Sequence, residues 1–419
     1  MKSVTHDAPI GWRYGLLGLP LAFVALPLYV QLPPLYAREF GVPLAALGAL
    51  LLVARLADAL FDPWVGVLVD RLFRRSTRSV LAAGGAAAVV LAIGFALLMF
   101  PPVRGTAALL AWAALALLVT YGAFSVLSVA HQSWGAMLGG DESARGRIVA
   151  WREGMGLIGV LLAAVLPALA GMQATACVLA AALAAGCWAW STSRCPLAHG
   201  GVREHRDWIA PLRDAAFRRL LAVFVLNGIA GAIPATLVIF FVQDRLQASP
   251  AQEPLFLATY FLCAALSIPL WLKLVARIGL ARTWLAGMAL AIAVFAWAAT
   301  VSAGDTGAFL VVCALSGVAL GTDLALPGAL LAGVIAQAGQ RGRGEGQYFG
   351  WWNFATKMNL ALAAGVALPL LALAGYSPGS RSPQALDALT LAYCLLPCLL
   401  KLAAAALLFF HLVRHGAAS

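Results

Sequence analysis

Charged residues are scarce in this chain, and their scarcity excludes an ordinary soluble fold. Asp, Glu, Lys and Arg make up 11% of the 419 residues, whereas hydrophobic residues make up 63% and the mean hydropathy is +0.90. A soluble domain has about 25% charged residues. We therefore expect lipid to be the main solvent around this protein.

Several cofactor and metal motifs are also missing. The seven Cys residues form no C-x-x-C pair, which speaks against a disulfide framework and a zinc site. No Walker-type phosphate loop is present, so ATP is not the driver. Gly154, Gly156 and Gly159 spell G-x-G-x-x-G, but no strand precedes them, and we interpret them as close helix packing. We expect no cofactor, and no metal beyond a possible Na⁺ at the carboxylates described below.

Long apolar runs dominate the chain. A bilayer-spanning helix needs about 20 mostly apolar residues. Twelve such stretches occur, at 12–36, 44–69, 80–100, 107–138, 149–171, 174–190, 220–242, 255–274, 283–302, 309–336, 348–374 and 388–413. They are apolar on all sides, which favours helices over the alternating strands of a membrane barrel. The sequence predicts an all-α membrane protein, and we expect no removable signal peptide.

The distribution of basic residues explains the net charge of +11. If the first span enters from the cytoplasm, most Lys and Arg fall in cytoplasmic loops and tails, and the outer loops keep only Arg38, Arg104, Arg245 and Arg381. This is the positive-inside pattern. It predicts cytoplasmic N and C termini and a multi-pass protein of the bacterial inner membrane. It also removes any need to invoke nucleic acid as a partner.

The longest hydrophilic stretch divides the chain into two halves. It predicts an N-terminal six-helix bundle at 1–192, a cytoplasmic linker at 193–219 and a C-terminal six-helix bundle at 220–419. A weak internal repeat supports this division, since Pro63 aligns with Pro269 and Arg71 with Arg277. The acidic residues of the first half do not repeat.

Three charged residues lie inside the second span. Arg55, Asp58 and Asp62 are three and four residues apart, so they share one stripe of a helix. A charge at this depth costs about 3 kcal/mol on insertion scales and usually faces a cavity or an ion path. Two carboxylates can share a proton or bind Na⁺, and we favour this coupling role over a structural ion pair with Arg55.

The loop that follows contains Gly66, Asp70 and Arg71, with Arg74 and Arg75 behind them. This pattern resembles the signature that the major facilitator superfamily carries between its second and third helices. The resemblance implies the major facilitator fold, with 12 transmembrane helices in two six-helix bundles. Gly66 would permit close helix contact, and Asp70 with Arg71 would act as a conformational latch. The alternative is an ordinary charged loop.

The wider run RLADALFDPWVG at 55–66 resembles the second helix of the glycoside-pentoside-hexuronide:cation symporters, the melibiose permease group. GDESAR at 140–145 with AWR at 150–152, and GQYFG at 346–350 leading to Lys357, resemble two other segments of that family. The resemblance implies cation-coupled symport of a small polar solute, such as a sugar or glycoside, by alternating access. It also implies that the cation binds at Asp58, Asp62 and Ser125, and that Arg152 and Lys357 lie at the sugar.

The chain departs from that family at three places. Phe61 replaces the Asn between the two aspartates, Ser128 replaces an acidic residue, and the acidic residue of the first helix is missing. The lost amide removes an oxygen ligand, so H⁺ is favoured over Na⁺ as the coupling cation. The expected partners are therefore a small-molecule solute, this cation and membrane lipids, and we expect a monomer.

Other polar residues complete the candidate substrate site, which comprises Arg152, Lys357, His131, Gln132 and Asp323. His131 either offers hydrogen bonds to a solute or forms an interhelical contact. Asp323 either lines the cavity or satisfies backbone groups freed by Pro327. Lys401 is equally deep, and both structural pairing and function stay open for it.

Two other functions are compatible with parts of this sequence. An exporter of drugs, amphiphiles or lipids would keep the same fold, and the missing sugar-binding acids favour it. A membrane prenyltransferase-type enzyme holds magnesium diphosphate on two Asp-rich motifs, and no second motif occurs here. We expect a transporter and not an enzyme.

Overall fold

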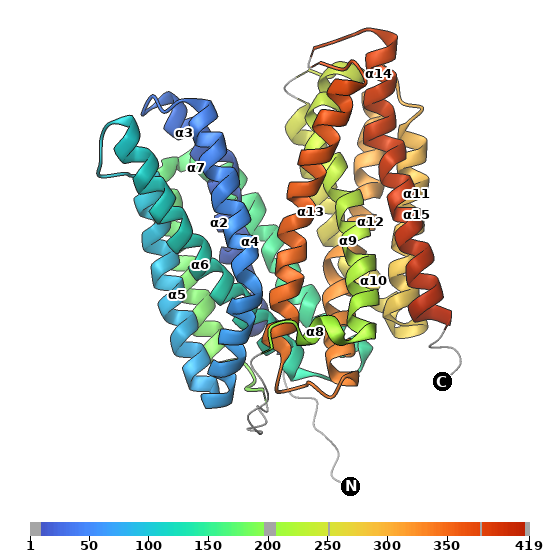
Figure 1. Ribbon diagram of the computed structural model, residues 1–419. Helices are drawn as coiled ribbons and strands as arrows, with labels where there is room; N and C mark the ends of the chain where they lie inside the picture. The colour runs from blue at the N-terminus through green and yellow to red at the C-terminus, as the bar shows by residue number, and fades with distance from the viewer. Residues whose placement is uncertain (1–9, 197–206, 250–251, 378, 415–419) are drawn as a thin grey trace. The chain divides into compact units, whose positions relative to one another are not determined.

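The computed structural model describes residues 10–196, 207–249, 252–377 and 379–414, and they are almost entirely helical (Figure 1). In chain order the elements are α1 (Ile10–Gly15), α2 (Gly18–Leu26), η1 (Pro27–Gln31), α3 (Leu32–Arg38), α4 (Leu44–Arg75), α5 (Thr77–Met99), α6 (Thr106–Leu138), α7 (Glu142–Ser191), α8 (Ala210–Arg213), α9 (Ala215–Phe240), η2 (Phe241–Arg245), α10 (Glu253–Ile278), α11 (Leu280–Ala298), α12 (Thr306–Gln337), α13 (Glu345–Leu373), α14 (Pro383–Thr390), η3 (Leu391–Leu395), α15 (Leu396–Leu408) and η4 (Phe409–Val413), where η marks π-helical turns.

All twelve predicted stretches are helical, which confirms the all-α prediction. Within the described residues, eight helices are long and apolar enough to cross a membrane: Thr77–Met99, Thr106–Leu138, Glu142–Ser191, Ala215–Arg245, Glu253–Ile278, Leu280–Ala298, Thr306–Gln337 and Pro383–Val413. One of these helices, α7, contains two predicted spans. The number of twelve spans stays a prediction, as do the cytoplasmic termini.

The two predicted spans inside α7 meet at a glycine. Gly171 has φ of 80° and ψ of 171°, a backbone conformation that residues with a side chain rarely adopt. At the start of α7, Asp141 accepts a hydrogen bond from the Ala144 N–H at 2.7 Å and so caps the helix. The chain thus changes direction at Gly171 and continues as a second helical segment.

The structure consists of two compact units, which we describe separately. The first unit comprises Met1–Pro211 and Ala332–Phe354. In it α2 packs along α7, while α5 and α4 pack against α6. Large side chains such as Trp134, Trp190 and Phe95 fill its core. The end of α12 and the start of α13 therefore belong to this unit, although the sequence division counts them with the second half.

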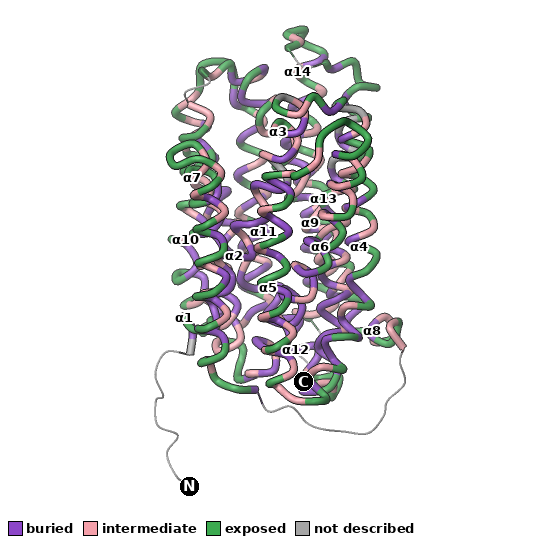
Figure 2. The backbone as a smooth tube through the Cα atoms, turned by 90° about the vertical axis from the view of Figure 1, so that its left-hand side faces the viewer, coloured by how far each residue is buried: buried purple, intermediate pink, exposed green. Residues whose placement is uncertain are grey.

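The second unit comprises Leu212–Leu331 and Ala355–Ser419. Both α9 and α11 pack against α15, and the rings of Phe241 and Tyr393 stack at 4.2 Å within its core. Exposed and buried residues alternate along the helices (Figure 2), and the exposed ones include many large apolar side chains, such as Leu266 and Leu373. Such a surface suits contact with lipid acyl chains, which have no need of polar groups.

Candidate functional site

A buried pair of carboxyl groups lies on α4. Asp58 is 5% exposed and Asp62 is fully buried, one helical turn further along. The Ser125 hydroxyl of α6 donates a hydrogen bond to Asp58 Oδ1 at 3.0 Å. The structure therefore brings Ser125 into direct contact with Asp58, and Asp62 shares the buried face of the same helix. These three oxygen-bearing side chains are the ones that the sequence proposes for the coupling cation.

Phe61 lies on a different face of α4. Its side chain is 57% exposed, and its ring lies 5.8 Å from that of Trp64. The residue that replaces the family's Asn therefore turns away from the buried carboxyl groups. Position 61 therefore supplies no group to the contact between Asp58 and Ser125.

Three glycines allow the backbones of α4 and α13 to touch within the first unit. A Cβ atom on Gly66 would lie 2.2 Å from the carbonyl oxygen of Gly346, and one on Gly350 would lie 2.6 Å from that of Asp62. Both distances are far shorter than a van der Waals contact. Any side chain at these positions would force the two helices apart, directly beside the carboxyl pair.

Asp70 connects the end of α4 to the start of α13. Its Oδ1 accepts a hydrogen bond from the Gly346 N–H at 2.7 Å, and its Oδ2 accepts one from the Gln347 N–H at 3.0 Å. These are free N–H groups at a helix N-terminus, where a carboxylate is stabilised by the helix dipole. Arg71, the other charged member of the predicted latch, is exposed.

A second buried carboxyl group accompanies Asp70. Glu345 is 1% exposed and accepts a hydrogen bond from the Gly342 N–H at 2.6 Å. Burial and the nearby Glu345 raise the pKa of Asp70 from 3.8 to about 8, even though the backbone N–H groups favour its ionised form. Burial likewise raises the pKa of Glu345 from 4.5 to about 7. Both groups lie beyond the predicted spans, on the side that the predicted topology assigns to the cytoplasm.

These raised pKa values make stability depend on pH. An acid whose pKa is higher in the folded state binds more protons when folded, so the free energy of unfolding falls as the pH rises from about 4 to about 8. We expect the thermal midpoint of purified protein to fall over this range, and to fall less in Glu345→Gln, which lacks one titrating group and the like charge beside Asp70. Glu39→Gln, the same change at an exposed position, is the control. A Glu345→Gln profile identical to that of the wild type would contradict this.

His131 lies in a contact between α1 and α6 and is fully buried. Its Nε2–H donates to the Tyr14 carbonyl oxygen at 2.8 Å, and the Tyr14 hydroxyl donates to the His131 carbonyl oxygen at 3.1 Å. Gln132 donates to the Ser128 hydroxyl at 2.8 Å. Arg152 forms an ion pair with Glu153 at 2.6 Å and keeps 15% of its side chain exposed. Of this group, His131 is the one whose side chain is fully buried, and its contact with Tyr14 joins two helices.

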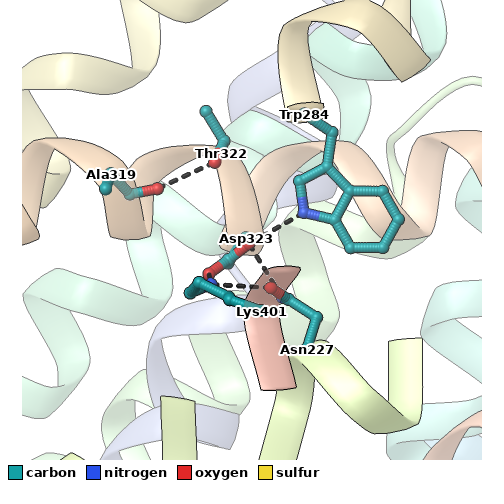
Figure 3. Close-up of polar contacts among 6 residues, drawn as sticks. All are labelled: Asn227, Trp284, Ala319, Thr322, Asp323 and Lys401. Carbon is teal, nitrogen blue, oxygen red and sulfur yellow. Dashed lines mark hydrogen bonds and ion pairs between the residues drawn. The ribbon is translucent and has the colours of Figure 1, made fainter. Parts of the chain in front are cut away.

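Asp323 is the centre of a polar cluster in the second unit (Figure 3). Its Oδ1 accepts hydrogen bonds from Asn227 Nδ2 at 2.9 Å and Trp284 Nε1 at 2.8 Å, and its Oδ2 pairs with Lys401 Nζ at 2.8 Å. Lys401 Nζ also donates to Asn227 Oδ1 at 2.6 Å. Lys357, on α13 of the same unit, is half-buried.

Sequence reasoning did not connect Asp323 with its partners. Asn227, Trp284 and Lys401 come from three other helices, and no motif surrounds them. Glu345 was missed beside Asp70 for the same reason. The available signal was the depth of each polar residue within an apolar span, which identifies Lys401 as unusual but does not reveal its partner.

These features define a class of protein. Apolar spans that enclose buried carboxyl groups and an ion pair are typical of a multi-pass membrane transporter, because charges kept at membrane depth usually serve an ion or solute path. The comparisons with known proteins agree with this class. A family model described as "MFS/sugar transport protein" matches residues 13–413. The chain belongs to this family of major facilitator transporters and is not an enzyme, so the prenyltransferase interpretation is wrong.

The individual relatives share either a short matching segment or a low sequence identity with this chain. The chain is 33% identical over 95 residues to "Uncharacterized symporter YnaJ" of Bacillus subtilis (strain 168), a match that covers 22% of this chain and only 20% of that protein. A crystal structure of a bacterial homologue of the iron transporter ferroportin has a TM-score of 0.75 at 15% identity and covers 96% of this chain and 99% of that one. The fucose:proton symporter FucP of E. coli has a TM-score of 0.67 at 14% identity, covering 95% and 98%. The structural similarity establishes the major facilitator fold.

Proposed function

We propose that this protein is a secondary active transporter that couples a cation, H⁺ in preference to Na⁺, to the symport of a small polar solute such as a sugar or glycoside. The buried pair of Asp58 and Asp62, with the Ser125 hydroxyl on Asp58, is the observation that carries the proposal. Two carboxyl groups one turn apart repel each other when both are ionised, and burial adds to this cost. A bound cation removes the repulsion.

A proton suits this pair for a physical reason. Protonation needs a single carboxyl group, whereas Na⁺ needs several oxygen ligands around it at once. The solute is proposed to meet the candidate residues Arg152 and Gln132 of the first unit and Lys357 and Asp323 of the second unit, and His131 contacts α1 within the first unit. We place the protein in the bacterial inner membrane as a monomer, with both termini in the cytoplasm. Cys labels at Gly200 and Ala417 should react only from the cytoplasmic side, and both positions lie outside the described residues.

Uptake into proteoliposomes tests the proposal. We expect radiolabelled solute to accumulate when an inward H⁺ gradient is imposed, and to stop accumulating when a protonophore is added. An inward Na⁺ gradient at equal pH is the matched condition and should give no accumulation. Accumulation driven by Na⁺ alone would show that the coupling cation is Na⁺ and not H⁺, with the proposed site unchanged. Efflux that runs against the solute gradient when H⁺ enters would instead favour the exporter.

A further inference from the structure

Three residues of the Asp323 cluster lie near the middle of apolar helices that are long enough to cross a membrane. Asp323 is near the middle of Thr306–Gln337, and Asn227 and Lys401 are near the middle of Ala215–Arg245 and Pro383–Val413. Secondary transporters bind their solutes near the midplane of the bilayer. The cluster also joins four helices, α9, α11, α12 and α15.

The hydrogen bonds of the cluster leave one acceptor and one donor side by side. A carboxylate accepts about four hydrogen bonds and an ammonium group donates three. Among the described residues, Asp323 accepts two at Oδ1 and one at Oδ2, while Lys401 Nζ donates two. The remaining position on Oδ2 and the remaining N–H of Lys401 belong to atoms 2.8 Å apart. A hydroxyl group, which donates one hydrogen bond and accepts others, matches this arrangement.

The cluster is open on the side of the carboxylate. The Asp323 side chain is 20% exposed and that of Lys401 is 7% exposed, whereas Trp284 is fully buried. An ionised carboxylate at the midplane does not face lipid, because the cost would be several kcal/mol, so this exposed edge faces a polar space. The Lys401–Asp323 pair has no net charge. A charged ligand group would therefore find no counter-charge here, and a neutral one fits better.

We infer that Asp323 Oδ2 and Lys401 Nζ bind a hydroxyl group of a neutral, polyhydroxylated solute, and that Asn227 and Trp284 are positioning residues that hold the carboxylate. This inference rests on the proposed transport of a polar solute and assigns part of that solute to the second unit. Lys401 holds the Asp323 carboxylate in place through their ion pair while it donates to the same hydroxyl.

The test is binding to purified wild-type protein and to the double variant Asp323→Asn/Lys401→Met, which removes both charges together. The probes are D-glucose, D-galactose, D-xylose and melibiose, then the monodeoxy analogues of whichever sugar binds. We expect the double variant to bind the parent sugar about tenfold more weakly, as for the loss of a hydrogen bond to a charged group. In the wild type, one deoxy analogue should bind about tenfold more weakly than the parent sugar. In the double variant, the same analogue and the parent sugar should bind equally well. The control Lys273→Met/Asp387→Asn neutralises two exposed groups of the same unit. It should change neither the affinity for the parent sugar nor the affinity lost with the deoxy analogue.

A purely structural ion pair gives a different result. The double variant would then bind the parent sugar like the wild type, or each deoxy analogue would lose the same affinity in both proteins, and either outcome would overturn the inference. If the double variant does not fold, Lys401→Arg replaces it, since the charge is kept and the free N–H is moved, and the same deoxy comparison applies. Binding of glucuronate, choline or lysophosphatidylcholine in place of every neutral sugar would also overturn the inference, while transport itself would stand. If solute transport proves not to depend on a cation gradient but the deoxy analogue still binds the wild type more weakly than the parent sugar, only the proposed cation coupling is overturned.

Discussion

Asp58→Asn and Asp62→Asn should each abolish uphill accumulation of the solute while sparing its exchange across the membrane. Each change removes one ionisable carboxyl group from the buried pair on α4 and keeps a side chain of nearly the same size. Without the titrating group, movement of the solute is no longer linked to movement of the cation. In proteoliposomes with an imposed H⁺ gradient, we expect the accumulation ratio to fall to about one, whereas counterflow of labelled solute continues.

Controls separate coupling from damage to the fold. Asp387→Asn makes the same chemical change at an exposed carboxylate and should accumulate solute like the wild type. Ser125→Ala removes the hydroxyl that donates to Asp58 at 3.0 Å and should weaken accumulation without abolishing it. Full concentrative uptake by the Asp58→Asn/Asp62→Asn double variant would refute the assignment, and Lys357 and Asp323 would be the next candidates.

Gly346→Ala should reduce transport by about one to two orders of magnitude. The added Cβ would lie 2.4 Å from the Gly66 carbonyl oxygen and 2.7 Å from Asp70 Oδ1. The first neighbour is backbone and cannot turn aside, so the start of α13 must shift away from α4. Overpacking of this kind costs about 1–3 kcal/mol, which corresponds to roughly a 5- to 150-fold shift in an equilibrium between conformations. Initial uptake rates, corrected for the amount of protein in the membrane, measure the effect.

The same helix provides the control. Gly365 also lies on α13, and a Cβ there would meet open space. Gly365→Ala should therefore transport like the wild type, although it too replaces a helical glycine by alanine. Equal rates for Gly346→Ala and Gly365→Ala would show that the contact with α4 has no part in the transport cycle.

The helices themselves were predictable because the apolar runs are long and the polar breaks are short. Every predicted stretch is helical, and even the break inside α7 falls at Gly171, where the prediction ended one span. The π-helical turns were not predictable, since the apolar pattern does not distinguish them from α-helix. The observed helix ends also differ from the predicted ends, because caps such as Asp141 lie outside the apolar run.

The candidate sites also differ in how far the sequence predicts them. Asp58 and Asp62 could be recognised because both lie on one helix, where spacing fixes the shared face. Contacts between helices have no such local signal. Asn227 is 96 residues from Asp323, and Lys401 is 78 residues from it. Gly346 is likewise 276 residues from Asp70. Only packing of the helices reveals these partners.

Solute-induced proton movement is the most direct test of the central claim that the pair on α4 couples the cation to the solute. The protein is placed in lightly buffered, de-energised vesicles, solute is added outside, and the external pH is recorded. The account predicts alkalinisation by the wild type and by Asp387→Asn, and no pH change with Asp58→Asn or Asp62→Asn while labelled solute still equilibrates. Undiminished alkalinisation by the Asp58→Asn/Asp62→Asn double variant would contradict it.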